Sequence, residues 1–170
     1  MKSVRTIILP VAFAGVFLLG FILRGLLVTP AAPSPTTADH AFVSGNYTVT
    51  RVLDGDTIEV AGGTRIRYEG IDAPELHERY GTAAYGLNKE LVSGKTIRVE
   101  LGQEKSDVYG RSLGYVYVGN TFVNKKMIEE GYATVLAYDK MKKPEFYDEF
   151  LAMQEEARAS HRGMWVREWK

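Results

Sequence analysis

The alternation of apolar and polar positions predicts two groups of β-strands with a helix between them. Short runs that are rich in Val, Ile and Thr and alternate in polarity are typical of strands. Tight-turn signals, Asp54-Gly55 and Gly62-Gly63, separate the first three runs, so these three should form antiparallel hairpins. The five strands are expected at Tyr47–Leu53, Thr57–Val60, Arg65–Ile71, Ile97–Leu101 and Leu113–Val118.

Segments with helical periodicity lie between and after these strands. Helices are expected at Tyr80–Val92, at Asn124–Glu130 and at Pro144–Ala159, the last with its proline in the first turn. The third helix should bury one apolar stripe, because four of its apolar positions are spaced four, three and four: Phe146, Phe150, Met153 and Ala157. The order of elements favours an α+β, mainly β fold, a five-stranded barrel of the OB type with about three helices.

One position breaks the alternation of the third predicted strand. Ile66 is in phase with the strand, but the next expected apolar position is shifted by one residue, to Ile71. A bulge at Gly70 would restore the phase, because an isolated glycine in a strand often marks one extra residue. With that extra residue, Asp72 should return to the face that carries Arg67.

The N-terminal part of the chain has the pattern of an export or anchor segment. Two bases precede Thr6–Leu23, an uncharged run of 18 residues, and Arg24 follows it. A cleaved signal usually has a core of about 7–15 residues, whereas a bilayer-spanning helix needs roughly 20. We therefore expect residues 1–29 to be a hydrophobic helix that anchors the protein in the cell membrane, with the following domain outside the cytoplasm. The alternatives are a cleaved signal peptide with secretion, for which Thr36-Thr37-Ala38 offers a small-residue site, and a buried core helix.

A stretch rich in Pro, Ala, Ser and Thr separates this segment from the remainder. Residues 30–44 cannot bury a core and favour extended conformations, so we interpret them as a linker. The folded domain should then cover 45–170, since 170 residues allow one domain with an appendage. We expect this domain to be monomeric.

Charge and composition narrow the chemistry that the chain can support. The 21 Lys and Arg residues equal the 21 Asp and Glu residues, which disfavours binding to nucleic acid through a large positive excess. Without the three bases of the first 38 residues, the remainder has 18 bases against 21 acids, a formal charge of −3. The absence of cysteine excludes disulfides, thiolate metal sites and cysteine nucleophiles. A metal ion would be held by oxygen atoms or by His40, His77 and His161.

Polar residues next to the predicted strands supply the parts that phosphodiester hydrolysis needs. Asp54 and Asp56 flank a turn glycine, and Asp72–Glu75 carries two carboxylates three residues apart. Carboxylates can hold a hard cation that neutralises phosphate charge, and a further carboxylate can activate water. Arg67 and Arg111 could bind phosphate oxygens. Each part alone is common in turns and on surfaces, so the argument depends on the combination.

Three motifs, in this order, resemble those of the staphylococcal nuclease (thermonuclease) family. They are Val52–Thr57 (VLDGDT), Arg67–Glu75 (RYEGIDAPE) and Asp107–Tyr117 (DVYGRSLGYVY). The likeness covers about residues 46–166 and extends to the closing Arg162–Trp165. Three motifs in sequence are far more specific than any one of them.

The resemblance implies a calcium-dependent nuclease that cleaves DNA, with RNA left open as a second substrate. It also assigns roles position by position. Asp56 and Asp72 would be the carboxylate ligands of Ca²⁺, with Ala73 contributing its backbone carbonyl. Glu75 would be the general base that orients water. The phosphate-binding arginines would be Arg67 and Arg111, and the aromatic residue that lines the nucleotide pocket would be Tyr109.

This sequence departs from the family pattern at several positions around the expected site. Ala73 replaces a threonine, which removes a hydroxyl, and Val108 replaces a lysine, which removes one phosphate contact. A pocket tyrosine falls on Ala137, although Tyr138 is adjacent. The segment between Glu75 and Tyr80 is also shorter than in the staphylococcal enzyme. These differences concern substrate affinity and base preference more than the chemical step.

A non-catalytic OB-fold module that binds nucleic acid is the alternative function. OB barrels often only bind, and a fold does not fix a function. The presence of Glu75 together with Arg67 and Arg111 distinguishes the two, because a binding module does not need a base beside a cation site.

Overall fold

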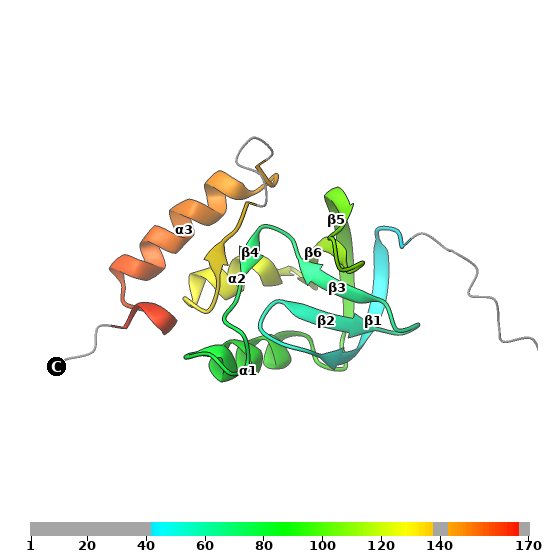
Figure 1. The fold of residues 1–170 in the computed structure, drawn as a ribbon, viewed down its shortest axis with the longest axis horizontal. Helices are drawn as coiled ribbons and strands as arrows, with labels where there is room; N and C mark the ends of the chain where they lie inside the picture. Colours follow the sequence, from blue (N-terminus) through cyan, green and yellow to red (C-terminus); the bar gives the residue numbers. More distant parts are fainter. Residues whose placement is uncertain (1–41, 138–142, 167–170) are drawn as a thin grey trace, which may run out of the picture. The chain divides into compact units, whose positions relative to one another are not determined.

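The computed structural model describes residues 42–137 and 143–166 (Figure 1). Eight strands lie in this part of the chain: β1 Gly45–Val52, β2 Thr57–Val60, β3 Arg65–Tyr68, β4 Ile71–Asp72, β5 Thr96–Ser106, β6 Ser112–Val118, β7 Thr121–Phe122 and β8 Thr134–Val135. The helices are α1 Gly81–Val92, α2 Val123–Glu129 and α3 Tyr147–Ala159, followed by the 3₁₀ turn η1 Gly163–Trp165.

Five strands close into a barrel. The sheet order is β3-β2-β1-β5-β6-β7, and β3 also pairs with β6, in parallel, which joins the two sides of the sheet. In that pairing Arg67 lies opposite Leu113. Closure of this kind leaves the barrel strands without a free edge. The structure therefore confirms the predicted fold, a mainly β five-stranded OB-type barrel with three helices.

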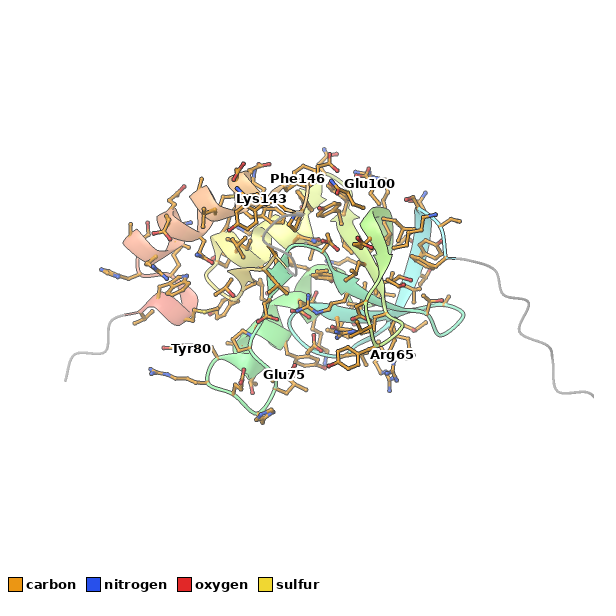
Figure 2. The ribbon with its side chains drawn as sticks, turned by 45° about the horizontal axis from the view of Figure 1, so that its top comes forward. Arg65, Glu75, Tyr80, Glu100, Lys143 and Phe146 are labelled. Atoms are coloured by element: carbon orange, nitrogen blue, oxygen red, sulfur yellow. The ribbon has the colours of Figure 1, made fainter. Side chains whose placement is uncertain are left out.

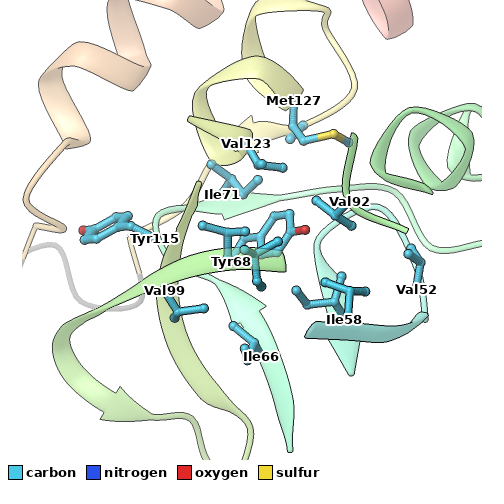
Figure 3. Close-up of a cluster of buried hydrophobic side chains, with 14 of the residues drawn as sticks. Val52, Ile58, Ile66, Tyr68, Ile71, Val92, Val99, Tyr115, Val123 and Met127 are labelled. Carbon is cyan, nitrogen blue, oxygen red and sulfur yellow. The ribbon is translucent and has the colours of Figure 1, made fainter. Parts of the chain in front are cut away.

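The barrel interior is filled by alternate residues of its strands. Ile58, Ile66, Tyr68 and Val99 are fully buried there (Figure 3). The helices cover the open parts of the barrel, with α2 between the barrel and α3 (Figure 1). The predicted apolar stripe of α3 is confirmed, since its members pack into or against this core: Phe146, Phe150, Met153 and Ala157.

The phase break in the third strand is a turn, so the prediction of a bulge is wrong. β3 ends at Tyr68, and Glu69 and Gly70 form the turn, with Gly70 at φ +79°. A side chain there would be strained at that φ, and its Cβ would lie 3.2 Å from the ring of Phe150. The chain then continues as β4, which pairs with β8. Asp72 nevertheless reaches Arg67, as predicted.

The helix boundaries also differ in detail from the predicted ones. α3 begins at Tyr147 and not at Pro144, because Phe146 has φ −95° and ψ 16°, outside the helical range. Pro144 instead accepts a hydrogen bond from the backbone N–H of Tyr147 in a turn. α1 begins at Gly81, after Tyr80 with φ 67°.

The predicted anchor, residues 1–29, and residues 30–41 of the predicted linker lie outside the described residues. Contacts with the barrel begin before Gly45, because the ring of Phe42 stacks on Tyr47 with centroids 4.5 Å apart. No helix within the described part of the chain is long and apolar enough to cross a membrane.

Candidate active site

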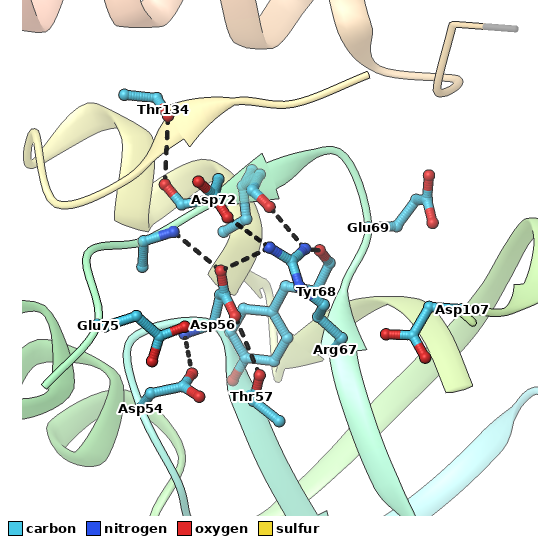
Figure 4. A network of polar contacts seen from close by, with 12 residues as sticks. Asp54, Asp56, Thr57, Arg67, Tyr68, Glu69, Asp72, Glu75, Asp107 and Thr134 are labelled. Carbon is cyan, nitrogen blue, oxygen red and sulfur yellow. Dashed lines mark hydrogen bonds and ion pairs between the residues drawn. The ribbon is translucent and has the colours of Figure 1, made fainter. Parts of the chain in front are cut away.

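The predicted site residues come from three loops and two strands, with Asp72 on β4, and Figure 4 shows Asp56, Arg67, Asp72 and Glu75 near one another. The β1–β2 loop contributes Asp56, the segment after β4 contributes Glu75, and the β5–β6 turn contributes Arg111. Arg67 lies on β3. Because β3 pairs with β6, the strand that carries Arg67 is a neighbour of the strand that begins next to Arg111.

A buried arginine joins the two carboxylates that were predicted to bind metal. Arg67 is only 5% exposed, and its Nη2 lies 2.6 Å from Asp72 Oδ1 and 3.2 Å from Asp56 Oδ2. Its Nη1 donates a hydrogen bond of 2.9 Å to the carbonyl oxygen of Ile71. These contacts fix the guanidinium, so its orientation is set before any ligand binds.

Asp56 is buried, and each of its two carboxylate oxygens accepts a hydrogen bond. Its Oδ2 accepts from the backbone N–H of Ala73 at 2.8 Å, and its Oδ1 accepts from the Thr57 hydroxyl at 3.0 Å. Burial raises the pKa of Asp56 to about 6, and Arg67 and the Ala73 N–H act against that rise. A cation bound next to Asp56 would favour its ionised form.

Close packing holds the β1–β2 loop against the segment after β4. Gly55 lies so near that a Cβ at this position would be 2.6 Å from Ala73 Cβ and 2.8 Å from Ala84 Cβ. The buried Asn88 of α1 also holds the loop, since its Nδ2 donates to the carbonyl oxygen of Asp54 at 2.9 Å. Asn88 Oδ1 in turn accepts from the Tyr68 hydroxyl at 2.7 Å.

Arg111 is oriented by Asp107 of the same turn. Arg111 donates to Asp107 twice, from Nε at 2.7 Å and from its backbone N–H at 2.9 Å. Burial by itself would raise the pKa of Asp107, but these hydrogen bonds outweigh it and lower the pKa, so the carboxylate stays ionised. Arg111 Nη1 also lies 3.5 Å from the hydroxyl of Thr57, which donates to Asp56. A chain of contacts thus connects the two arginines.

Glu75 and Tyr109 lie at an open hollow beside this network. The hollow is also lined by Arg111 and by the turn between β2 and β3. The Glu75 side chain is exposed, and its backbone N–H donates to Glu78. Tyr109 is 82% exposed, with its ring 5.6 Å from the Arg111 guanidinium. An exposed carboxylate and a fixed guanidinium therefore face the same space.

The donor set fits a hard cation that is only partly held by the protein. Within the described residues, no group of three or more His, Cys, Asp or Glu side chains converges. Asp56 and Asp72, however, both approach one nitrogen of Arg67, so the two carboxylates lie next to each other. Ca²⁺ takes six to eight oxygen ligands, and carbonyl, water and phosphate oxygens can supply the others.

The structure brings the predicted residues together in two groups. Asp56, Arg67, Asp72, Ala73 and Arg111 belong to the network of contacts, whereas Glu75 and Tyr109 line the hollow. Tyr138, which is adjacent to the position where the family has a pocket tyrosine, lies outside the described residues.

The residues that position this network were not among the predicted site residues. Thr57 connects Arg111 with Asp56, and Asn88 supports the loop that carries Asp56. One signal for Asn88 was present, because it falls midway between Ala84 and Val92 on the buried stripe of α1. A polar residue at such a position needs a buried hydrogen-bond partner.

This barrel, with Glu75 and Arg111 at one open hollow and two carboxylates joined by Arg67 beside it, has the parts of a phosphodiester-hydrolysing enzyme. Residues 65–167 match the family model described as staphylococcal nuclease homologue. The chain belongs to the staphylococcal nuclease family, as the three motifs predicted.

Individual relatives are similar over most of this chain. A thermonuclease of Staphylococcus intermedius is 32% identical over 177 residues, which cover 98% of this chain and all of that protein. An uncharacterised endonuclease of Escherichia coli O157:H7 is 42% identical over 121 residues, or 69% of this chain and 74% of its own. Endonuclease YncB of Bacillus subtilis strain 168 is 34% identical over 71% of this chain and 61% of its own.

Proposed function

We propose that this protein is a calcium-dependent nuclease that cleaves DNA, with RNA as a second substrate, outside the cytoplasm. The observation that carries the proposal is the buried Arg67 between Asp56 and Asp72, with the exposed Glu75 and the fixed Arg111 at one hollow. The names of the relatives, thermonuclease and endonuclease, support a nucleic-acid substrate.

Each of the site side chains has its own role in the proposed phosphodiester hydrolysis. Glu75 accepts a proton from a water molecule, whose oxygen attacks phosphorus and forms the new P–O bond. The P–O ester bond on the opposite side breaks, its oxygen takes a proton from solvent water and leaves as an alcohol, and Glu75 returns its own proton to solvent. Arg67 and Arg111 donate hydrogen bonds to the other phosphate oxygens and stabilise the charge that develops there. Ca²⁺, when held by Asp56, Asp72 and the carbonyl of Ala73, supplies Lewis-acid stabilisation of the phosphate.

Calcium should be required for cleavage, and the requirement should depend on Asp72. Plasmid DNA should be degraded in calcium and spared when a chelator is added. Asp72→Asn keeps the shape of a side chain that is 55% exposed but removes a charged ligand, so cleavage in calcium should fall roughly 10²-fold or more. The measurement is the initial rate of plasmid nicking against calcium concentration.

Asp148→Asn is the matched control for that experiment. Asp148 is an 84% exposed carboxylate on α3, away from the site residues, so its loss should leave the rate unchanged. Cleavage that continues in chelator would contradict the calcium requirement. Binding of DNA without cleavage under any of these conditions would favour the non-catalytic binding module.

Location outside the cytoplasm is proposed from the N-terminal sequence. The uncharged run Thr6–Leu23 is long enough to remain in a bilayer, with two bases before it. Immunoblots of fractionated cells should find the full-length chain in membranes, with the nuclease domain cleaved by protease added from outside once any outer barrier is opened. A shortened protein in the soluble extracellular fraction would indicate a cleaved signal, and protection of the domain from protease would contradict the proposal.

A further inference from the structure

The hollow continues beyond the residues assigned to catalysis, towards the turn between β2 and β3. The residues Gly63, Thr64 and Arg65 belong to its lining there, and Glu75 and Arg111 belong to the same lining. In Figure 2, Arg65 and Glu75 project on the same side of the domain. Two positive charges therefore line one continuous surface, and the proposed chemistry uses only that of Arg111.

Arg65 is weakly engaged by the protein. It is 58% exposed, and its ion pair within the described part of the chain is a contact of 3.9 Å between Nε and Glu59 Oε2. Glu59 makes a shorter contact with Arg51, whose Nη2 lies 2.9 Å from the same oxygen. Strand pairing places Arg51, Glu59 and Arg65 in one row across β1, β2 and β3. Glu59 is thus committed mainly to Arg51, and the Arg65 guanidinium can turn towards a ligand.

The position of Arg65 on its strand relates it to the proposed reaction centre. Arg65 and Arg67 lie on the same face of β3, because alternate residues of a strand share a face, and Ile66 between them is buried in the barrel. Two residues of a strand span about 7 Å. This spacing is comparable to that of successive phosphates along an extended nucleic-acid strand. The tip of the β5–β6 turn contributes no competing charge, since Val108 there is exposed and apolar.

We propose that Arg65 is a substrate-binding residue that holds the phosphate next to the scissile phosphate of a nucleic-acid strand lying in the hollow. The inference rests on the proposed nuclease function and extends it to a second phosphate. A guanidinium suits this position because it presents several N–H donors to phosphate oxygens. Arg65 touches no reacting atom, so its contribution is to affinity and not to the chemical step.

The test compares Arg65→Ala with Arg158→Ala in the full-length protein. Arg158 is the matched control, because its side chain is 54% exposed and its ion pair with Glu155 is a contact of 3.8 Å, but it lies on α3 and does not line the hollow. On a single-stranded oligonucleotide at low salt, Arg65→Ala should raise KM about tenfold, the value of one charged hydrogen bond, with kcat unchanged. The slope of log(1/KM) against log salt should become shallower by about 0.7, and Arg65→Lys should recover that slope. Arg158→Ala should change neither quantity.

The location of the bound phosphate is tested with short oligonucleotides in which one linkage at a time is an uncharged methylphosphonate. For the wild-type protein, an uncharged linkage next to the cleaved bond should raise KM by about the same factor as Arg65→Ala. In Arg65→Ala the same linkage should add little, because the contact is already lost. Additive effects at both neighbouring linkages would overturn the proposal, as would equal behaviour of Arg65→Ala and Arg158→Ala. If the wild-type protein cleaved none of these substrates, the proposed function itself would fail.

Discussion

Replacing Glu75 with glutamine should lower kcat by about 10²–10⁴-fold, the usual contribution of a general base. Glutamine has the same shape but lacks the basic oxygen, so it cannot accept the proton of the attacking water. The fold should tolerate the change, because the Glu75 side chain is exposed at the hollow and its recorded hydrogen bond is made by its backbone N–H. KM for an oligonucleotide should stay close to that of the wild-type protein.

Steady-state kinetics in calcium measure this effect, and Glu155→Gln provides the control. Glu155 is an exposed carboxylate on α3 and should be replaceable without loss of rate. A Glu75→Gln protein with a kcat near the wild-type value would remove the general-base role. If the arginine variants were also active, the proposed catalytic site as a whole would be wrong.

Replacing Arg111 with lysine should lower kcat and kcat/KM together, by about 10²–10³-fold. Lysine keeps the charge, but it has no planar fork with which to bind a phosphate in bidentate fashion. It also cannot reproduce the Nε contact of 2.7 Å by which Asp107 orients Arg111. An equal loss in both constants indicates an interaction that is made only in the transition state.

Arg67→Lys and Arg158→Lys complete this experiment. Arg67 points into the space between two carboxylates. We expect it to bind the phosphate in the ground state as well as in the transition state, so its replacement should also raise KM. Arg158 on α3 is exposed, and Arg158→Lys should behave as the wild-type protein does. Thermal unfolding of each variant separates a loss of chemistry from a loss of folded protein. An Arg111→Lys enzyme within about twofold of the wild-type rate would contradict the assigned role.

The barrel was predictable because its signals are local. Strands with one face buried alternate with a period of two, and turns between them contain Gly and Asp, so both features can be recognised within a few residues. The break in the apolar–polar alternation at Gly70 was recognised for the same reason. A bulge and a turn, however, shift that alternation in the same way. The distinction depends on Phe150 and β8, which are distant in sequence. The start of α3 was misplaced because Pro144 is compatible both with a first helical turn and with the preceding loop.

The site residues with charged side chains were identifiable from their motifs, whereas those that position them were not. Asp56, Arg67 and Arg111 stand in motifs whose chemistry can be recognised from residue types and order. Thr57 acts through its contacts with Asp56 and Arg111, and Asn88 acts through its hydrogen bond to the β1–β2 loop, so each role depends on a partner that is distant in sequence. Arg65 was expected only as the first residue of a strand, because nothing local indicates that the hollow reaches it.

The parallel pairing of β3 with β6 also determines the stage of folding at which the protein can become active. The two arginines are separated in sequence by α1 and β5, and this closing pair brings their strands together. Contacts between distant segments form late in folding, because the entropy of closing the intervening loop has to be offset first. A newly synthesised, still unfolded chain therefore carries every catalytic side chain but no assembled site.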